Sequence, residues 1–356
     1  MKRVMVTGCG GYAAIGFVRC LKESPERIFL IGTDCDEKYI NFGETDKNIL
    51  IPPANSDNYI DVINRLVEKY HIDFIHAQPP AEILYLSKNR GEIDATLFLP
   101  RHQTIQICDD KFVSNEIWRR KGIPTAKSIF IKKEDDLTEV FNEIQKPIWL
   151  RANKGAGAKG CFLVNNIKEA KMWIDFNNGW GNFMASEYLP GKNYGCDLLF
   201  NEGELICSQA KLRLQYVLHK ANPLGITGTT GFLKCVNEVK VNIEAEKAIY
   251  SIDPTPHGVF SVDFRENKNN ILCVTEINAG RFLSSSLHLF HKSKLLLPYW
   301  YVKLAYNEKI PEVKKYNPLP DGLVLIRQVD AEPKVLMWNE LEKLRKIRDD
   351  NGYAEL

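Results

Sequence analysis

The chain has 356 residues, which is enough for two or three domains. Hydrophobic residues make up 44% of it and charged residues 26%, and this ordinary composition excludes a largely disordered chain. A formal net charge of +2 gives no reason to expect a nucleic-acid partner, and no apolar run reaches the roughly 20 residues that span a membrane. Nine scattered cysteines without a C-x-x-C pair predict reduced thiols in a cytoplasmic protein.

Strand and helix patterns alternate over the first hundred residues. A short apolar strand over 3–7 ends in the glycine-rich turn 8–11, and a helical pattern follows. This alternation predicts an α/β domain, placed at residues 1–105, with a doubly wound parallel sheet covered by helices on both faces. Further strands are expected over 28–32, 73–77 and 95–99, and an amphipathic helix over 59–70.

The pattern changes to an α+β type near residue 106. A helix is expected over 109–122, because Gly122 and Pro124 follow its apolar repeat. Long strand patterns over 258–266 and 271–277 are separated by a few polar residues. We divide this part of the chain into segments 106–190, 191–310 and 311–356. The other predicted elements include strands over 128–131, 148–151, 161–164 and 182–188, helices over 167–175 and 242–252, a helical region over 284–306, and a terminal strand pair with a charged helix.

The glycine-rich turn allows two interpretations. Residues 8–13 fit the pattern G-x-G-x-x-A between a strand and a helix, and Asp34 follows the next strand, as in dinucleotide-binding proteins. The alternative is a tight turn that any doubly wound sheet needs. A short-chain dehydrogenase would also need Tyr and Lys four residues apart on a mid-chain helix, and the three such pairs present have unconvincing contexts.

A second series of motifs lies between residues 110 and 278. Cations occur near strand and helix ends, and a loop with three glycines spans 154–160. Glu276 and Asn278 are two residues apart on one strand pattern, so their side chains share a face, and Asp263 lies on the neighbouring strand pattern. Oxygen ligands of this kind suit Mg²⁺, and a nucleoside triphosphate needs cations, N–H donors and Mg²⁺. The alternative is a set of polar residues at the end of a solvated hairpin.

In the order and spacing of these motifs the sequence resembles the ATP-grasp superfamily, especially a synthetase half of the carbamoyl-phosphate synthase large subunit. The resemblance covers residues 1 to about 306. It implies an N-terminal doubly wound domain followed by a two-lobed ATP-grasp fold, with ATP and Mg²⁺ as cofactors and Mn²⁺ able to substitute. It places Mg²⁺ at Asp263, Glu276 and Asn278.

The resemblance also assigns the remaining site residues. Two positions depart from the family: Asn193 stands where Glu often contacts the ribose, and Arg281 comes one residue later than the Arg of the family's Asn-Pro-Arg motif. The implied nucleotide-binding residues are Lys111, Arg151, Lys159, Gly155, Gly157, Gly160, Glu187, Tyr188, Leu189 and Asn193, and the implied catalytic residues are Lys154, Arg213 and Arg281.

The implied function is that of an ATP-dependent ligase. It would activate a small-molecule carboxylate as an acyl phosphate for attack by an amine, releasing ADP and phosphate, and a homodimer is the expected assembly. The alternatives are a split subunit similar to carbamoyl-phosphate synthase, a dinucleotide-binding oxidoreductase, and a non-catalytic nucleotide-binding protein. In the ligase, the turn 8–11 is expected to serve the acceptor substrate or the interdomain cleft and not to bind NAD.

Overall fold

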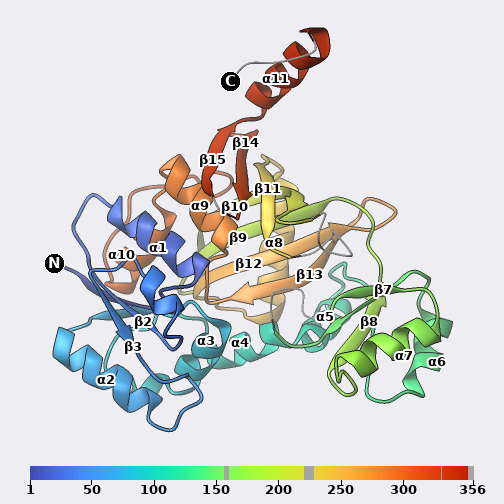
Figure 1. Ribbon diagram of the computed structural model, residues 1–356, viewed down its shortest axis with the longest axis horizontal. Helices are drawn as coiled ribbons and strands as arrows, with labels where there is room; N and C mark the ends of the chain where they lie inside the picture. Colours follow the sequence, from blue (N-terminus) through green and yellow to red (C-terminus); the bar gives the residue numbers. More distant parts are fainter. Residues whose placement is uncertain (156–159, 220–227, 330, 352–356) are drawn as a thin grey trace.

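The computed structural model describes residues 1–155, 160–219, 228–329 and 331–351. Three sheets follow one another along the chain: a four-stranded parallel sheet, a four-stranded antiparallel sheet and a seven-stranded antiparallel sheet (Figure 1). The predicted combination of α/β and α+β organisation is confirmed. No described helix is long and apolar enough to cross a membrane.

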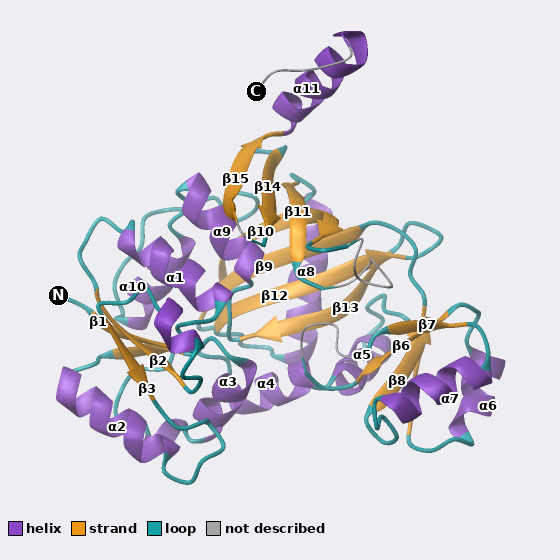
Figure 2. Ribbon diagram, in the orientation of Figure 1, coloured by secondary structure: helices purple, strands orange, loops and turns teal. Residues whose placement is uncertain are grey.

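Helices cover both faces of the parallel sheet, whose strand order is β3-β2-β1-β4 (Figure 2). Val4 and Val6 of β1 pack in one core with α1 and α10, whereas Met5 packs in another core with α2 and α3. Alternate side chains thus point to opposite faces of a doubly wound sheet. The elements are β1 (Arg3–Thr7), α1 (Tyr12–Lys22), β2 (Phe29–Asp34), η1 (Tyr39–Phe42), β3 (Lys47–Leu50), α2 (Tyr59–Tyr70), β4 (Phe74–His76), α3 (Pro80–Lys88) and η2 (Arg90–Glu92).

The strand expected over 95–99 is wrong. Only Thr96 pairs with the sheet, through a single bridge to Phe74. The chain then leaves the sheet, because the Phe98 ring packs 5.3 Å from that of Tyr301 and the Phe98 carbonyl lies against Gly258 of the central sheet. The apolar pattern of residues 95–99 therefore predicts a strand, although this segment connects two sheets.

The small antiparallel sheet has its own apolar core, formed by residues such as Leu137, Leu150 and Ile174. Its strand order is β5-β8-β6-β7. The helix predicted over 109–122 corresponds to α5, which begins after Asp110, whose carboxylate accepts a hydrogen bond from the Val113 N–H at 3.0 Å. The elements here are α4 (His102–Asp109), α5 (Lys111–Arg120), β5 (Ser128–Ile131), α6 (Asp136–Glu143), β6 (Ile148–Ala152), β7 (Phe162–Val164), α7 (Ile167–Phe176) and β8 (Phe183–Glu187).

The central sheet has the order β13-β12-β9-β10-β11-β14-β15. One face packs on α8 through residues such as Leu198, Phe260 and Val262. The region expected to be helical over 284–306 consists of two helices, because α9 ends at Ser293 and the next residue, Lys294, has a left-handed φ of 58°. The elements are β9 (Asn193–Asn201), β10 (Glu204–Tyr216), β11 (Thr230–Cys235), α8 (Val239–Ile252), β12 (Gly258–Glu266), β13 (Leu272–Ala279), α9 (Ser284–Ser293), α10 (Leu297–Ala305), β14 (Leu323–Gln328), β15 (Ala331–Met337) and α11 (Trp338–Asn351).

The other face of the central sheet carries a buried polar cluster. The Lys211 ammonium on β10 donates hydrogen bonds to the Asp197 carboxylate on β9 and to the Ser286 hydroxyl on α9. Asp197 Oδ1 also accepts from the hydroxyls of Ser261 at 2.6 Å and Ser286 at 2.9 Å. The Lys211 and Asp197 side chains are only 2% and 1% exposed. This cluster therefore fixes helix α9 to the sheet with its charges paired.

Removal of one partner from this cluster should destabilise the fold. We expect Asp197→Ala to lower the free energy of unfolding by about 3–5 kcal/mol, because Lys211 would keep a buried charge without its counter-ion. Chemical denaturation measures this change. The control Asp135→Ala removes an exposed carboxylate paired with Lys133 and should change the free energy by less than about 0.5 kcal/mol. A small loss in Asp197→Ala would contradict the argument.

Candidate active site

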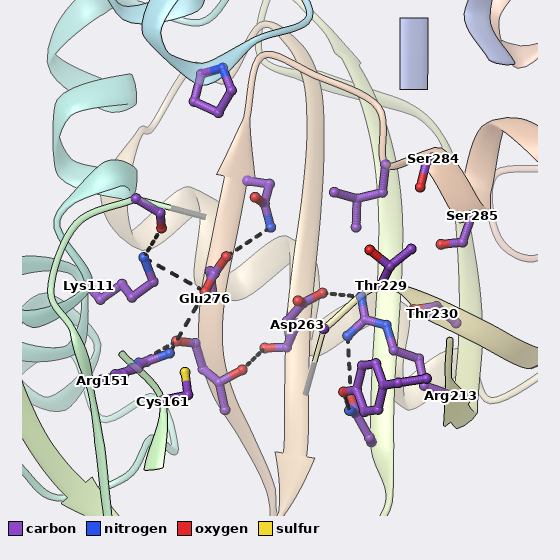
Figure 3. A pocket seen from close by; sticks show the side chains of 18 of the residues that line it. Lys111, Arg151, Cys161, Arg213, Thr229, Thr230, Asp263, Glu276, Ser284 and Ser285 are labelled. Carbon is purple, nitrogen blue, oxygen red and sulfur yellow. Dashed lines mark hydrogen bonds and ion pairs between the residues drawn. The ribbon is translucent and has the colours of Figure 1, made fainter. Parts of the chain in front are cut away.

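A cavity of about 410 Å³ lies where the three sheets meet. Its wall takes residues from the turn after β1, from the small sheet and from the central sheet, and Figure 3 shows part of it. The structure thus brings together most of the residues that the sequence predicted. Those lining the cavity are Lys111, Arg151, Gly155, Glu187, Tyr188, Leu189, Asn193, Arg213, Asp263, Glu276, Asn278 and Arg281.

Two carboxylates face each other on adjacent strands. Asp263 of β12 pairs directly with Glu276 of β13 in the antiparallel register. Like charges in this position repel, and the surrounding cations offset the repulsion. Arg213 Nη2 lies 2.6 Å from Asp263 Oδ1, whereas Glu276 Oε2 lies 3.8 Å from Arg151 Nη1 and 4.0 Å from Lys111 Nζ (Figure 3).

The surroundings move the pKa values of the two carboxyl groups in opposite directions. Burial raises the pKa of Asp263, and Arg213 only partly compensates. Burial alone would also raise the pKa of Glu276, but Lys111 and Arg151 lower it overall. Two adjacent, partly buried carboxyl groups whose pKa values are shifted in opposite directions are typical of a site that a bound cation would stabilise.

The donor set fits a divalent cation that prefers oxygen. Asn278 is two residues beyond Glu276, so its amide lies on the same face, and it donates to Glu276 Oε1 at 3.3 Å. Arg281 Nη2 donates to Asn278 Oδ1 at 2.5 Å. Among the described residues no group of three or more His, Cys, Asp or Glu could hold a metal. A Mg²⁺ ion here would therefore need oxygens from phosphate and water to complete its shell.

Gly195 allows Arg213 to reach Asp263. Strand β9 lies between β10 and β12, and Gly195 is the residue of β9 that pairs with Asp263. A Cβ atom on Gly195 would lie 3.1 Å from Arg213 Nη2, so the guanidinium crosses β9 directly over this glycine. Burial would lower the pKa of Arg213, but Asp263 raises it overall. Gly195 was not predicted as a site residue, because a lone glycine in a strand does not indicate which side chain crosses it.

The glycine-rich loop agrees with the prediction only in part. Lys111 Nζ donates to the Gly155 carbonyl at 2.6 Å, at the cavity wall. Lys154 does not line the cavity: it is 67% exposed, and its ammonium lies 3.7 Å from Asp110 Oδ2. Gly160 is packed under the Phe183 ring, where a Cβ atom would lie 2.4 Å from Cζ. The predicted residues Gly157 and Lys159 lie outside the described part of the chain.

The segment 187–189 also lines the cavity. The Glu187 carboxylate accepts a hydrogen bond from the Lys127 N–H at 2.9 Å. Asn193, expected near a ribose, is also engaged: its Nδ2 donates to the Tyr216 hydroxyl at 2.5 Å, and its Oδ1 accepts from Arg213 at 3.3 Å.

The turn after β1 has the geometry of a tight turn. The Gly10 N–H donates to Asp34 Oδ2 at 3.0 Å, and Asp34 Oδ1 accepts from the Asp36 N–H. A Cβ atom on Gly10 would lie 1.8 Å from the Tyr39 carbonyl oxygen, so backbone of η1 fills the space that a pyrophosphate would need. Gly8 and Gly11, in contrast, line the cavity together with the first residues of α1.

Several cavity residues were absent from the sequence prediction. Ser284 and Ser285 open helix α9, and a run of three serines was the only available signal. Asn115 lies four residues after Lys111, so both side chains belong to one face of α5, and this spacing could have identified it. Further lining residues include Trp149, Cys161, Tyr216, Thr229 and Thr230.

No family model matches the chain. The α chain of propionyl-CoA carboxylase from Ruegeria pomeroyi is 24% identical over 181 residues, which are 48% of this chain and 25% of that protein. Biotin carboxylase 1 from Bacillus subtilis is 23% identical over 166 residues, which are 45% of this chain and 37% of that protein. The chain therefore spans only 25–37% of the length of these curated relatives.

Solved structures match the whole fold. N5-carboxyaminoimidazole synthetase from Staphylococcus aureus, complexed with ADP, has a TM-score of 0.70 at 16% identity, covering 99% of this chain and 86% of that one. The biotin carboxylase domain dimer of 2-oxoglutarate carboxylase from Hydrogenobacter thermophilus, in complex with MgADP, ADP and bicarbonate, has a TM-score of 0.69 at 16% identity, covering 92% and 74%. These likenesses establish the fold. The chain therefore has the fold that the resemblance to the ATP-grasp superfamily predicts.

Proposed function

We propose that the protein is an ATP-dependent ligase that joins a carboxylate to an amine through an acyl phosphate. The observation that carries this proposal is the pair Asp263–Glu276, which faces four cations across one cavity. Solved structures of this fold that contain ADP, MgADP and bicarbonate support it. The cations are Lys111, Arg151, Arg213 and Arg281.

The nucleotide would occupy the part of the cavity between the small and central sheets. Backbone groups of segment 187–189 would contact the base, while Lys111 and Arg151 would bind the phosphates beside Gly155. Asp263, Glu276 and Asn278 would hold Mg²⁺, with Mn²⁺ as a substitute. When bound, the ion supplies charge neutralisation on the phosphate oxygens. The residues of the chain itself would orient the reactants and stabilise negative charge.

The carboxylate substrate would bind at the other end of the cavity. Helices α1 and α9 both begin there, and neither has a side-chain N-cap, so the first N–H groups of each helix are available to an anion. Ser284 and Ser285 add hydroxyl groups, and Arg281 lies beside them. This arrangement fits the expectation that the turn 8–11 serves the acceptor substrate.

The reaction would proceed in two balanced steps. A carboxylate oxygen attacks the γ-phosphorus of ATP, and the bond from that phosphorus to the β-phosphate oxygen breaks, so ADP leaves. The amine nitrogen then attacks the acyl carbon, the bond between that carbon and the phosphate oxygen breaks, and inorganic phosphate and a proton leave. Arg213 and Arg281, which line the cavity, would stabilise the transferring group.

The assembly and the location of the protein are also proposals. A homodimer is supported by the dimeric biotin carboxylase domain of the same fold, and light scattering of the purified chain tests it. A cytoplasmic location is supported by the free thiols of all nine cysteines. A split subunit similar to carbamoyl-phosphate synthase would be distinguished by a requirement for a partner that supplies ammonia.

Replacement of Glu276 tests the proposed metal site. We expect Glu276→Gln to reduce Mg²⁺-dependent ADP release about 100-fold or more, because the amide keeps the shape of the side chain and removes its charge. A coupled assay for ADP measures the effect, and circular dichroism verifies the fold. Glu204→Gln, at an exposed position of β10, is the control and should retain activity. Activity near that of the parent in Glu276→Gln would refute the assignment.

Replacement of Gly11 tests the end of the cavity that we propose binds the carboxylate substrate. A Cβ atom there would contact only the Gly8 carbonyl, at 3.1 Å, so Gly11→Val would project into the cavity. We expect KM for the carboxylate to rise about tenfold while the affinity for ATP stays within a few-fold. The control Gly91→Val adds the same bulk where nothing lies within 4 Å. Equal losses for both ligands would place this end of α1 outside the acceptor site.

The packed turn predicts that nicotinamide dinucleotides do not bind. Calorimetry with NAD and NADP should give no micromolar binding, because Tyr39 covers Gly10 and Asp34 is engaged by two backbone N–H groups. MgATP should bind in the same assay. Micromolar NAD binding that is lost in Asp34→Ala would instead support the oxidoreductase alternative.

A further inference from the structure

Helix α11 projects away from the body of the protein (Figures 1 and 2). It follows β15, the edge strand of the central sheet, and packs mainly against that strand. Most of its described side chains are exposed. A helix of 14 residues is marginally stable in water unless an apolar face of it is packed against another surface. The helix would therefore be stabilised by a surface that covers its apolar side chains.

The first turn of α11 is fixed to the central sheet. The Trp338 ring stacks on the Phe232 ring of β11, with 6.1 Å between the ring centroids and 13° between the planes. Lys234 Nζ lies 5.0 Å from the centroid of the Trp338 ring. The Glu340 carboxylate accepts a hydrogen bond from the Met337 N–H at 2.6 Å. These contacts fix the direction in which α11 leaves the sheet, so its outer turns have a defined orientation.

One face of α11 carries the apolar side chains that follow Trp338. Leu341, Leu344 and Ile347 are three residues apart, and Ile347 is 44% exposed. At about 100° of rotation per residue, Leu341 and Ile347 lie roughly 60° to either side of Leu344. Glu340 and Arg348 lie roughly 40° to either side of it on the same basis. These five side chains therefore form one face, which we call the Leu344 face.

The Leu344 face is complementary to itself. Its residues along the chain are Glu340, Leu341, Leu344, Ile347 and Arg348, an order that places acidic and basic ends symmetrically about Leu344. Against an antiparallel second copy, with a two-fold axis at Leu344, Leu341 would face Ile347 of that copy. Glu340 would face Arg348 of the second copy in the same way. A two-fold interface requires a surface that fits its own copy, and this face meets that requirement in apolar contact and in charge.

Both charged residues of the Leu344 face can contact a second copy. Glu340 accepts from the Met337 N–H through Oε2, and a carboxylate has a second oxygen for a further donor. Arg348 Nη2 lies 2.7 Å from Asp349 Oδ1, and these two side chains are 60% and 63% exposed. An exposed ion pair between neighbouring residues contributes little to stability. Arg348 can therefore turn to a carboxylate of another chain at small cost.

We propose that α11 is a homodimer contact, in which the helices of two copies pair antiparallel through the Leu344 face. The proposal locates the interface of the homodimer proposed above. It does not depend on the ligase reaction, and no described residue of α11 lines the cavity. Two helices of this length form a contact smaller than the standard interface of about 1,600 Å². The dissociation constant of the dimer is therefore expected in the micromolar range.

Sedimentation velocity of the full chain over a range of concentrations tests this contact. The parent should change from monomer to dimer at micromolar concentration. Leu344→Asp places two like charges at the two-fold axis and should raise the dissociation constant at least tenfold. The matched control is Lys346→Asp, which introduces the same residue roughly 160° away around the helix. It should change the dissociation constant less than threefold.

Charge exchange tests the antiparallel arrangement without removing an apolar side chain. Glu340→Lys would bring two basic residues together at each end of the contact, and Arg348→Glu would bring two acidic residues together. Each variant alone should therefore dimerise about tenfold more weakly than the parent. An equimolar mixture of the two variants pairs opposite charges at both ends. It should form a heterodimer whose dissociation constant is within about fivefold of that of the parent dimer. Circular dichroism verifies that each variant is folded.

The outcomes separate this inference from the ligase function. A parent that stays monomeric up to high micromolar concentration overturns both the α11 contact and the homodimer. A dimer that Leu344→Asp and the two charge variants leave unchanged overturns the role of α11 and places the interface on another surface. Single charge variants as tightly dimeric as the parent would refute the antiparallel arrangement. The ligase function is tested by substrate-dependent ADP release, which should be the same in the parent and in Leu344→Asp; absence of this activity in the parent refutes the ligase and not the contact.

Discussion

The repulsion between Asp263 and Glu276 is the constraint on which the cavity depends. The two carboxylates are paired across adjacent strands, each about a quarter exposed, and both burial and their mutual repulsion disfavour the charged form of each. Each therefore has its own cations, which come from different parts of the chain. Arg213 reaches Asp263 from β10, whereas Lys111 and Arg151 approach Glu276 from α5 and β6. These ion pairs thus hold β10, α5 and β6 around the cavity.

The central sheet can carry this charge because its two faces are different. Along β9 the side chains alternate between an apolar face, packed on α8, and a polar face that carries Asn193, Gly195 and Asp197. The same alternation on β10, β12 and β13 aligns their polar residues with those of β9. Gly195 is the one position in this row where a side chain would obstruct the contact across the sheet. The alternation of side chains along each strand therefore brings the polar residues of the site onto one face, and the absence of a side chain at Gly195 leaves room for the contact between Arg213 and Asp263.

Features set by local pattern were predictable from the sequence. Glu276 and Asn278 share a face because they are two residues apart, and the doubly wound sheet follows from alternating strands and helices. Features set by tertiary contact were not. Lys154 lies within the predicted loop, yet its ammonium lies near Asp110 rather than in the cavity, and residues 95–99 leave the parallel sheet because Phe98 packs beside Tyr301. The hydrogen bond from the Gly10 N–H to Asp34 could not be predicted either, because the same sequence motif occurs in cofactor-binding turns and in turns that bind no cofactor.

Two ion pairs on the same face of the central sheet show why residue type alone does not reveal a role. Lys211–Asp197 and Arg213–Asp263 each join a cation of β10 to a carboxylate on a neighbouring or next-neighbouring strand. The first pair is almost completely buried, and two serine hydroxyls satisfy the remaining capacity of its carboxylate, so it has no group left for a ligand. The second pair lines the cavity, and its carboxylate is 23% exposed. Two residues of displacement along one strand thus separate a pair that holds helix α9 in place from a pair that can still bind a metal ion or a substrate.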